Sequence, residues 1–213
     1  MPIEAEIKAR VRRPEAIREA MRGRADAEVR VYTDAYYDAP GHPLTASGRE
    51  LRIRTVTTSA AGRDHGPNPP ATASNRSHRA ETTTTVSGHT ILTYKAPSVH
   101  EATGSKPESK TEVSDPEALD AILRGLGYEP VISYEKQCTN WSYSTSGRRL
   151  LATLVTVPDL DGTFLEIETL TEDPSDLPEA LAVVRAEMLA LGIEEHDFTT
   201  ELYTEAVARS RTG

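Results

Sequence analysis

The chain begins with a run in which apolar and charged side chains alternate strictly. Ile3, Ala5, Ile7, Ala9 and Val11 share one parity, and Glu4, Glu6, Lys8 and Arg10 share the other. Because successive side chains of a β-strand point to opposite faces, the run predicts a strand with one apolar and one charged face. A solvated sheet face would explain this pattern in one strand. Two acids beside two bases would also suit a site that binds a divalent cation together with a polyanion.

The same charge bias recurs on most of the other strands that the sequence predicts. Charged side chains share a parity at Arg52 and Arg54, at Lys95, at Lys106, Glu108, Lys110 and Glu112, at Lys136, and at Glu166 and Glu168. If these faces point inward together, they fill the interior with charge that an ordinary core would not tolerate unpaired. A solvent-filled tunnel that binds a polyphosphate and its metal ion resolves this difficulty.

The overall pattern predicts an α+β fold that is mainly β. Strands are expected at residues 3–11, 28–38, 50–57, 89–95, 108–114, 131–143, 149–157 and 163–170, with a turn at 39–43. Helices are expected at 14–23, from an Asp115 cap to about Gly125, from an Asp176 cap to Leu191, and at 200–209. Eight strands joined mostly to their sequence neighbours predict an antiparallel sheet that closes into a barrel.

We expect residues 1–210 to form a single domain, since 213 residues suffice for one core of moderate size. Residues 58–87 are rich in Ser, Thr, Gly, Pro and Asn and predict a disordered loop insertion. Cys138, the only cysteine, is expected to pack as a small hydrophobe.

Net charge limits the partners and the location that we expect. A formal charge of -9 argues against general nucleic-acid or membrane binding, so a basic cluster would have to be local and directed at a small anionic molecule. We expect a monomer or a homodimer. The chain shows no long apolar run and no signal-peptide pattern, which predicts a cytoplasmic protein.

Five motifs, in order along the chain, resemble those of the CYTH proteins. They are Glu4-x-Glu6-x-Lys8, Tyr36-Tyr37-Asp38, Leu51-Arg52-Ile53-Arg54, Leu92-Thr93-Tyr94-Lys95-Ala96-Pro97 and Phe164-Leu165-Glu166-Ile167-Glu168. This family, also called triphosphate tunnel metalloenzymes, includes class IV adenylyl cyclases and thiamine triphosphatases. The resemblance extends from Ile3 to about Leu202. It implies an eight-stranded antiparallel tunnel barrel that binds a triphosphate with one or two Mg²⁺ or Mn²⁺ ions.

The resemblance also implies roles for individual residues. Glu4 and Glu6, with Glu166 and Glu168 from the opposite wall, would bind the metal, and Glu4, Glu6 and Lys8 would form the catalytic set. The phosphate path would be lined by Lys8, Arg52, Arg54, Lys95 and Lys136, together with Lys106 or Lys110. Arginine can bind phosphate bidentately, whereas lysine acts more as a point charge.

Within the family, the motifs look most similar to those of bacterial class IV cyclases. The first expectation is therefore conversion of ATP to cyclic AMP and pyrophosphate. The alternative is a triphosphatase that hydrolyses thiamine triphosphate, a nucleoside triphosphate or inorganic triphosphate, and the second alternative is a non-catalytic polyphosphate- or nucleotide-binding protein.

One departure from the cyclase pattern leaves these alternatives open. Val155 stands at about the position of a metal-binding acid. Either a second metal is lost, or Asp159 or Asp161 in the adjacent loop substitutes, or the ligand or the chemistry differs.

Overall fold

A computed structural model describes residues 1–58 and 88–212. The predicted insertion at 58–87 lies outside the described residues except for Thr58, which ends a strand. The strands are β1 (Ile3–Val11), β2 (Glu28–Asp38), β3 (Glu50–Thr58), β4 (Gly88–Lys95), β5 (Lys106–Val113), β6 (Glu129–Thr145), β7 (Arg148–Thr156) and β8 (Thr163–Thr171). The helices are α1 (Pro14–Arg22), α2 (Pro43–Ala46), α3 (Pro116–Gly125), α4 (Leu177–Ala190) and α5 (Tyr203–Ser210), with 3-10 turns η1 (Pro174–Asp176) and η2 (Glu195–Asp197).

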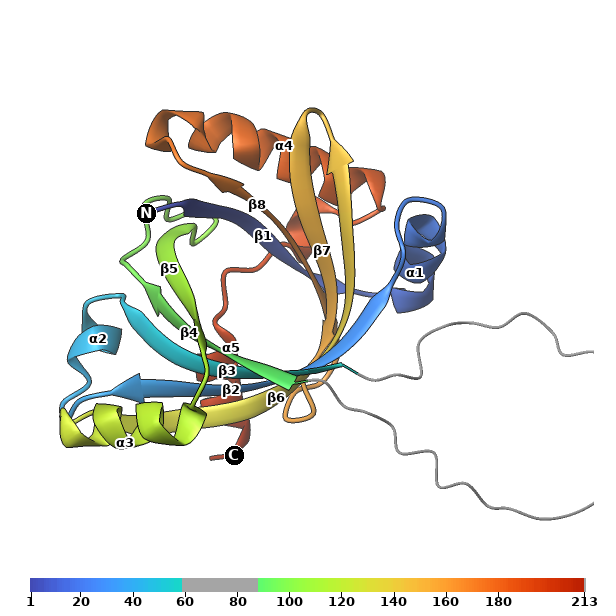
Figure 1. Ribbon diagram of the computed structural model, residues 1–213. Coiled ribbons are helices and arrows are strands. Elements are labelled where there is room, and N and C mark those ends of the chain that lie inside the picture. The colour runs from blue at the N-terminus through green and yellow to red at the C-terminus, as the bar shows by residue number, and fades with distance from the viewer. Residues whose placement is uncertain (59–87, 213) are drawn as a thin grey trace, which may run out of the picture.

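The strands close into an antiparallel barrel with helices around it (Figure 1). The hydrogen-bonded order around the ring is β1-β5-β4-β3-β2-β6-β7-β8. The first and last strands are therefore neighbours, and β2 and β3 lie across the ring from them. The predicted eight-stranded antiparallel barrel is confirmed. Among the described helices, none is long and apolar enough to cross a membrane.

The sequence does not predict α2, which follows the expected turn after β2. The Asp38 carboxylate accepts hydrogen bonds from the backbone nitrogens of Leu44 at 3.0 Å and Thr45 at 2.9 Å, and from the Thr45 hydroxyl at 2.8 Å. These bonds satisfy backbone donors that the first turn of a helix leaves without a partner. Asp38 of the Tyr-Tyr-Asp motif therefore organises the β2–β3 connection.

One predicted helix cap is confirmed and one is wrong. Asp115 caps α3, where its carboxylate accepts a hydrogen bond from the Ala118 nitrogen at 2.9 Å. Asp176 makes no such bond to α4. Its backbone is already helical because η1 precedes α4, and its carboxylate instead accepts hydrogen bonds from Arg148 at 2.5 Å and the Thr171 hydroxyl at 2.9 Å.

The apolar face of β1 packs outside the barrel. Its alternate side chains, from Ile3 to Val11, are buried in one cluster with Leu181, Val184 and Met188 of α4. Figure 1 shows α4 lying along β1 and β8. Because the period of a strand is two, burying this face against α4 turns the charged parity of β1 toward the barrel interior.

One end of the interior is apolar. Cys138, Val155 and Phe164 lie on the inward parities of β6, β7 and β8, and they pack against Tyr203 and Val207 of α5. Cys138 is 2% exposed, which confirms its predicted packing role. The charged side chains occupy the remainder of the interior.

Candidate functional site

The barrel encloses a cavity of about 290 Å³ whose lining is strongly charged. Every side chain that the sequence predicts as catalytic, substrate-binding or metal-binding lines it. Among the described residues, eight lysines and arginines and five glutamates do so, including Arg30 and Glu50, which were not predicted. The whole chain has a net charge of -9, so this local excess of cations among the lining residues contrasts with the rest of the chain.

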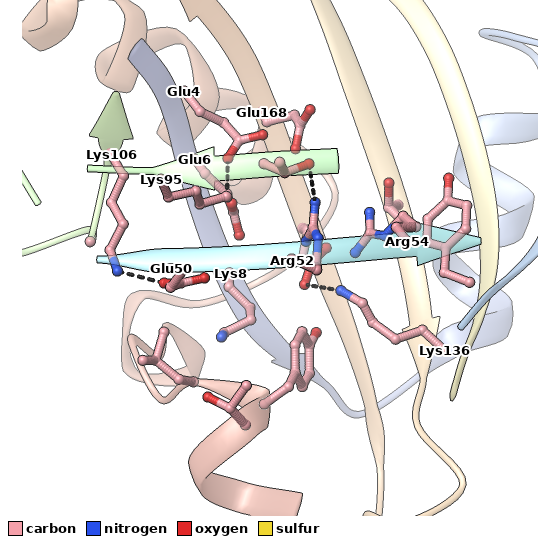
Figure 2. A pocket seen from close by; sticks show the side chains of 18 of the residues that line it. Glu4, Glu6, Lys8, Glu50, Arg52, Arg54, Lys95, Lys106, Lys136 and Glu168 are labelled. Atoms are coloured by element: carbon pink, nitrogen blue, oxygen red, sulfur yellow. Dashed lines mark hydrogen bonds and ion pairs between the residues drawn. The ribbon is translucent and has the colours of Figure 1, made fainter. Parts of the chain in front are cut away.

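Three carboxylates converge on one side of the cavity (Figure 2). Oxygens of Glu4, Glu6 and Glu168 lie within 4.8 Å of one another. Burial, reinforced by the Glu166 and Glu4 charges, raises the pKa of Glu6 to about 7. Burial and the Glu4 charge likewise raise the pKa of Glu168 well above its usual range. A divalent cation would relieve this repulsion, and carboxylate oxygens are ligands that Mg²⁺ and Mn²⁺ favour, so the donor set fits such an ion.

The position of β8 differs from the expectation. The resemblance implies that Glu166 and Glu168 lie on the wall opposite β1, but β8 pairs directly with β1, with Glu168 facing Glu6 and Glu166 facing Lys8 in register. The barrel closes by joining its first and last strands, so the expected opposite wall is wrong. Glu166 is not one of the three converging carboxylates, although its charge acts on Glu6, and its oxygen lies 3.4 Å from Lys136 Nζ.

Two lysines, one from β4 and one from β5, stabilise the ionised form of Glu4. Lys95 Nζ lies 2.5 Å from one Glu4 oxygen, and Lys110 Nζ lies 3.4 Å from the other. Burial alone would raise the pKa of Glu4, but the two lysines outweigh it and lower that pKa. Both lysines also pair with Glu108 of β5. Lys106 Nζ instead lies 2.5 Å from a Glu50 oxygen. Of the two lysines that the sequence leaves as alternatives, Lys106 and Lys110, it is therefore Lys110 that lies beside the carboxylates.

The two arginines of β3 face the cavity from across the ring. Arg54 donates two hydrogen bonds to Asp34 of β2, at 2.6 Å and 2.7 Å. Burial alone would raise the pKa of Asp34, but Arg54 lowers it. Arg52 makes longer contacts, 3.4 Å to the Thr93 hydroxyl and 4.0 Å to Asp34. Within the described part of the chain its buried Nε has no hydrogen-bond partner, so Arg52 is less fully paired than Arg54.

The C-terminal segment completes the lining. Tyr203 of α5 lies in the cavity wall, and the Nζ atoms of Lys8 and Lys136 lie 4.5 Å and 4.4 Å from its ring centroid. Lys8 Nζ also donates a hydrogen bond to the Glu201 carbonyl, and burial lowers the pKa of Lys8. Burial and the charge of Glu166 raise the pKa of Tyr203, so its hydroxyl keeps its proton.

Sequence reasoning missed both Asp34 and Tyr203. Asp34 shares its parity with Tyr32 and Tyr36, and that alternation on β2 was an available signal. No comparable pattern marks Tyr203, because only the fold brings the start of α5 to the strands.

β7 contributes no carboxylate to the cavity. Its inward residues are Leu151, Thr153 and Val155, and Val155 is fully buried in the apolar end of the barrel. Asp159 pairs with Arg211 at 2.9 Å, and Asp161 is exposed. Neither aspartate is among the described residues that line the cavity, so neither replaces the missing acid in this structure.

Residues 2–203 match the CYTH domain family. The structure is similar to that of a Pyrococcus horikoshii protein, at 24% identity and a TM-score of 0.72, covering 98% of this chain and 99% of that one. It is also similar to a Vibrio parahaemolyticus protein described as a candidate adenylate cyclase, at 20% identity and a TM-score of 0.70, covering 97% and 98%.

A third similar structure is a candidate adenylyl cyclase from Hippeastrum that is described as having a dominant triphosphatase activity. It is 15% identical, with a TM-score of 0.59, and the match covers 99% of this chain and 96% of that one. A comparison with curated proteins found no match. At these identities the structural likeness shows the fold.

Proposed function

Because the chain belongs to the CYTH domain family, we propose that it is a metal-dependent enzyme that processes an organic triphosphate inside its barrel. The observation that carries the proposal is a cluster of three carboxylates inside a cavity that is also lined by lysines and arginines. Glu4, Glu6 and Glu168 lie on the adjacent strands β1 and β8, and Arg52 lies across the ring on β3. Lysines of β4, β5 and β6 lie between these walls (Figure 2).

The mechanism that we propose is electrostatic. Glu4, Glu6 and Glu168 would hold a Mg²⁺ or Mn²⁺ ion, which when bound supplies positive charge to phosphate oxygens and to the leaving group. Arg52, which lines the cavity and is less fully paired than Arg54, would bind a phosphate. Lys110, whose side chain is 41% exposed, would turn from Glu4 toward the ligand. Because strands hold these groups in place before the ligand arrives, they stabilise developing charge with little reorganisation.

Adenylyl cyclase chemistry is the first form of the proposal. The ribose 3′-hydroxyl of ATP would lose its proton and bond to the α-phosphorus, while the bond to the bridging oxygen breaks and pyrophosphate leaves. The motifs around Arg52, Lys95 and Glu166 support this form, since they look most like those of bacterial class IV cyclases. The likeness to the Vibrio protein agrees with it.

Triphosphate hydrolysis is the alternative, and the small volume of the cavity and the lack of an acid on β7 favour it. Attack by water on the terminal phosphorus requires only the polyphosphate to enter the barrel. The cavity of about 290 Å³ lies just below the range for ligand pockets, roughly 300–1,000 Å³. Val155 leaves β7 without an acid for a second metal ion, and the activity described for the Hippeastrum protein agrees with hydrolysis.

Product analysis distinguishes these reactions. The purified protein would be incubated with ATP, thiamine triphosphate or inorganic triphosphate, in Mg²⁺, in Mn²⁺ and in a chelator. Cyclic AMP with pyrophosphate would support the cyclase, and released phosphate would support the triphosphatase. Calorimetric binding without turnover would favour the second alternative, a non-catalytic binding protein.

Two isosteric variants test the metal site. Glu4→Gln and Glu6→Gln each remove a ligand charge at nearly constant volume, so both should lose metal-dependent turnover while circular dichroism shows an intact fold. Glu19→Gln on the exposed face of α1 is the matched control and should retain full activity. Unchanged turnover in both cavity variants would refute the metal assignment.

A further inference from the structure

Tyr203, the first residue of α5, contacts two lysines and two aromatic side chains. Its ring carries the Lys8 and Lys136 ammonium groups at 4.5 Å and 4.4 Å from the centroid. The Phe164 ring meets it edge-on at 5.3 Å, and Tyr134 lies at 6.5 Å. Two cations over one buried aromatic ring interact favourably with its π-face, and the two aromatic neighbours limit how the ring can turn.

The hydroxyl of Tyr203 is the least satisfied part of this arrangement. The residue is 8% exposed and lines the cavity. Within residues 1–58 and 88–212 its oxygen forms no hydrogen bond of ordinary geometry, although the Glu166 carboxylate lies near enough to add to the rise in pKa that burial causes. A buried hydroxyl without a partner is unfavourable, and a ligand in the cavity is one source of the missing bond.

The chain around Tyr203 is anchored to β1, so its position is defined. The Thr199 nitrogen donates a hydrogen bond to the Lys8 carbonyl at 2.9 Å, and Lys8 Nζ donates one to the Glu201 carbonyl. The Glu201 carboxylate pairs in turn with Arg10 and Arg209. The segment that precedes Tyr203 therefore also positions the ammonium group of Lys8, a predicted catalytic residue.

We propose that Tyr203 is a ligand-binding and positioning residue of the tunnel. Its hydroxyl donates a hydrogen bond to a phosphate oxygen of the triphosphate, and its ring holds Lys8 and Lys136 toward that same phosphate. The role of the ligand's phosphate rests on the proposed function, whereas the contacts of the ring do not. The site is therefore completed by the C-terminal helix as well as by the strands.

Calorimetry with inorganic triphosphate and Mg²⁺ tests this role. Tyr203→Phe removes only the oxygen, so it should weaken binding about 10-fold or more while the melting temperature stays unchanged. Tyr203→Leu also removes the aromatic face, so it should weaken binding further. Tyr143→Phe is the matched control, because the Tyr143 hydroxyl donates to Glu187, which does not line the cavity, at 3.2 Å. Its affinity should equal that of the wild type.

The outcomes separate this role from the proposed function. Wild-type protein that bound no triphosphate would refute the proposed function and this role together. Wild-type binding that Tyr203→Phe reproduced would refute the hydroxyl's role alone. Equal weakening of binding by the Phe and Leu variants would refute the role of the ring. If Tyr203→Phe lowered the melting temperature enough to account for its loss of affinity, Tyr203 would be a merely structural residue.

Discussion

Arg54 and Asp34 form a bidentate ion pair in the barrel wall, with Nε 2.6 Å from one carboxylate oxygen and Nη2 2.7 Å from the other. The Asp34 side chain is fully buried, and that of Arg54 is 16% exposed. Arg52, on the same face of β3, approaches Asp34 only to 4.0 Å. Two arginines that one motif predicts as equivalent phosphate ligands thus differ, because Arg54 has a close carboxylate partner and Arg52 does not.

Asp34→Asn should destabilise the protein strongly. The change leaves Arg54 as a buried cation without its counter-charge, which typically costs about 3–5 kcal/mol of unfolding free energy. Urea unfolding would measure the loss. Glu19→Gln breaks the exposed pair with Arg22 and should change stability little. A similarly small loss for Asp34→Asn would show that the buried pair does not hold the two strands together.

Arg52→Ala should weaken the binding of inorganic triphosphate about 10- to 100-fold, since it removes charge-assisted hydrogen bonds to the ligand. Arg54→Ala should also weaken it. Arg10→Ala is the matched control, because Arg10 shares the parity of the β1 site residues but is 55% exposed and pairs with Glu201 at 3.3 Å. Calorimetry would compare the three. Equal losses for Arg10 and the β3 arginines would mean that the charges facing the ligand have been misassigned.

The stability of the metal-free protein should fall as the pH rises toward neutral. The pKa of Glu6 is raised from 4.5 to about 7, so the folded state binds this proton more tightly than the unfolded state does. Folding is therefore favoured below this window and loses that contribution as the pH rises through it. Glu168 shifts in the same direction. The lowered pKa values of Glu4 and Asp34 act in the opposite sense and at lower pH.

Melting temperatures measured in a chelator between about pH 5 and pH 8 would show this fall. Mn²⁺ should raise the melting temperature most at the upper end, because the ion binds deprotonated carboxylates. Glu6→Gln cannot ionise and should flatten the profile. A metal-induced shift that did not change with pH would contradict the ligand role of Glu6.

Val155→Asp should not restore a metal ligand. Val155 packs against Cys138 and Phe164 at the apolar end of the barrel, so a carboxylate there would be buried among apolar groups. We expect a large loss of stability by urea unfolding and no change in the number of Mn²⁺ ions bound. Thr153→Asp is the informative comparison, because Thr153 lines the cavity opposite Glu166 in the β7–β8 register. A stable Val155→Asp protein with an additional Mn²⁺ ion would overturn this view of β7.

Much of the fold follows from local patterns. The alternation from Ile3 to Val11 predicts both the strand and its two faces, and the structure buries the apolar face under α4. The Asp115 cap is equally local and is confirmed. The Asp176 cap is wrong because contacts with Arg148 and Thr171, more distant in the chain, compete for its carboxylate.

The sequence predicts which residues form the candidate site better than it predicts how those residues are arranged. Parity and the family motifs together predict site residues that all line the cavity, whereas Glu108 and Glu112, which share the parity of Lys110, do not line it. Parity and the motifs do not predict that Glu168 joins Glu4 and Glu6 while Glu166 lies beside Lys136. That division depends on the register between β1 and β8, which lie at opposite ends of the sheet-forming chain.

By itself, the sequence determined which side chains share a face, because the period of a strand is a property of neighbouring residues. Only the tertiary structure decided which faces meet. Closure of the barrel placed β8 beside β1, Arg52 across the ring from them and Tyr203 over Lys8 and Lys136. These relationships join residues far apart in the chain, and packing of the whole barrel selects them.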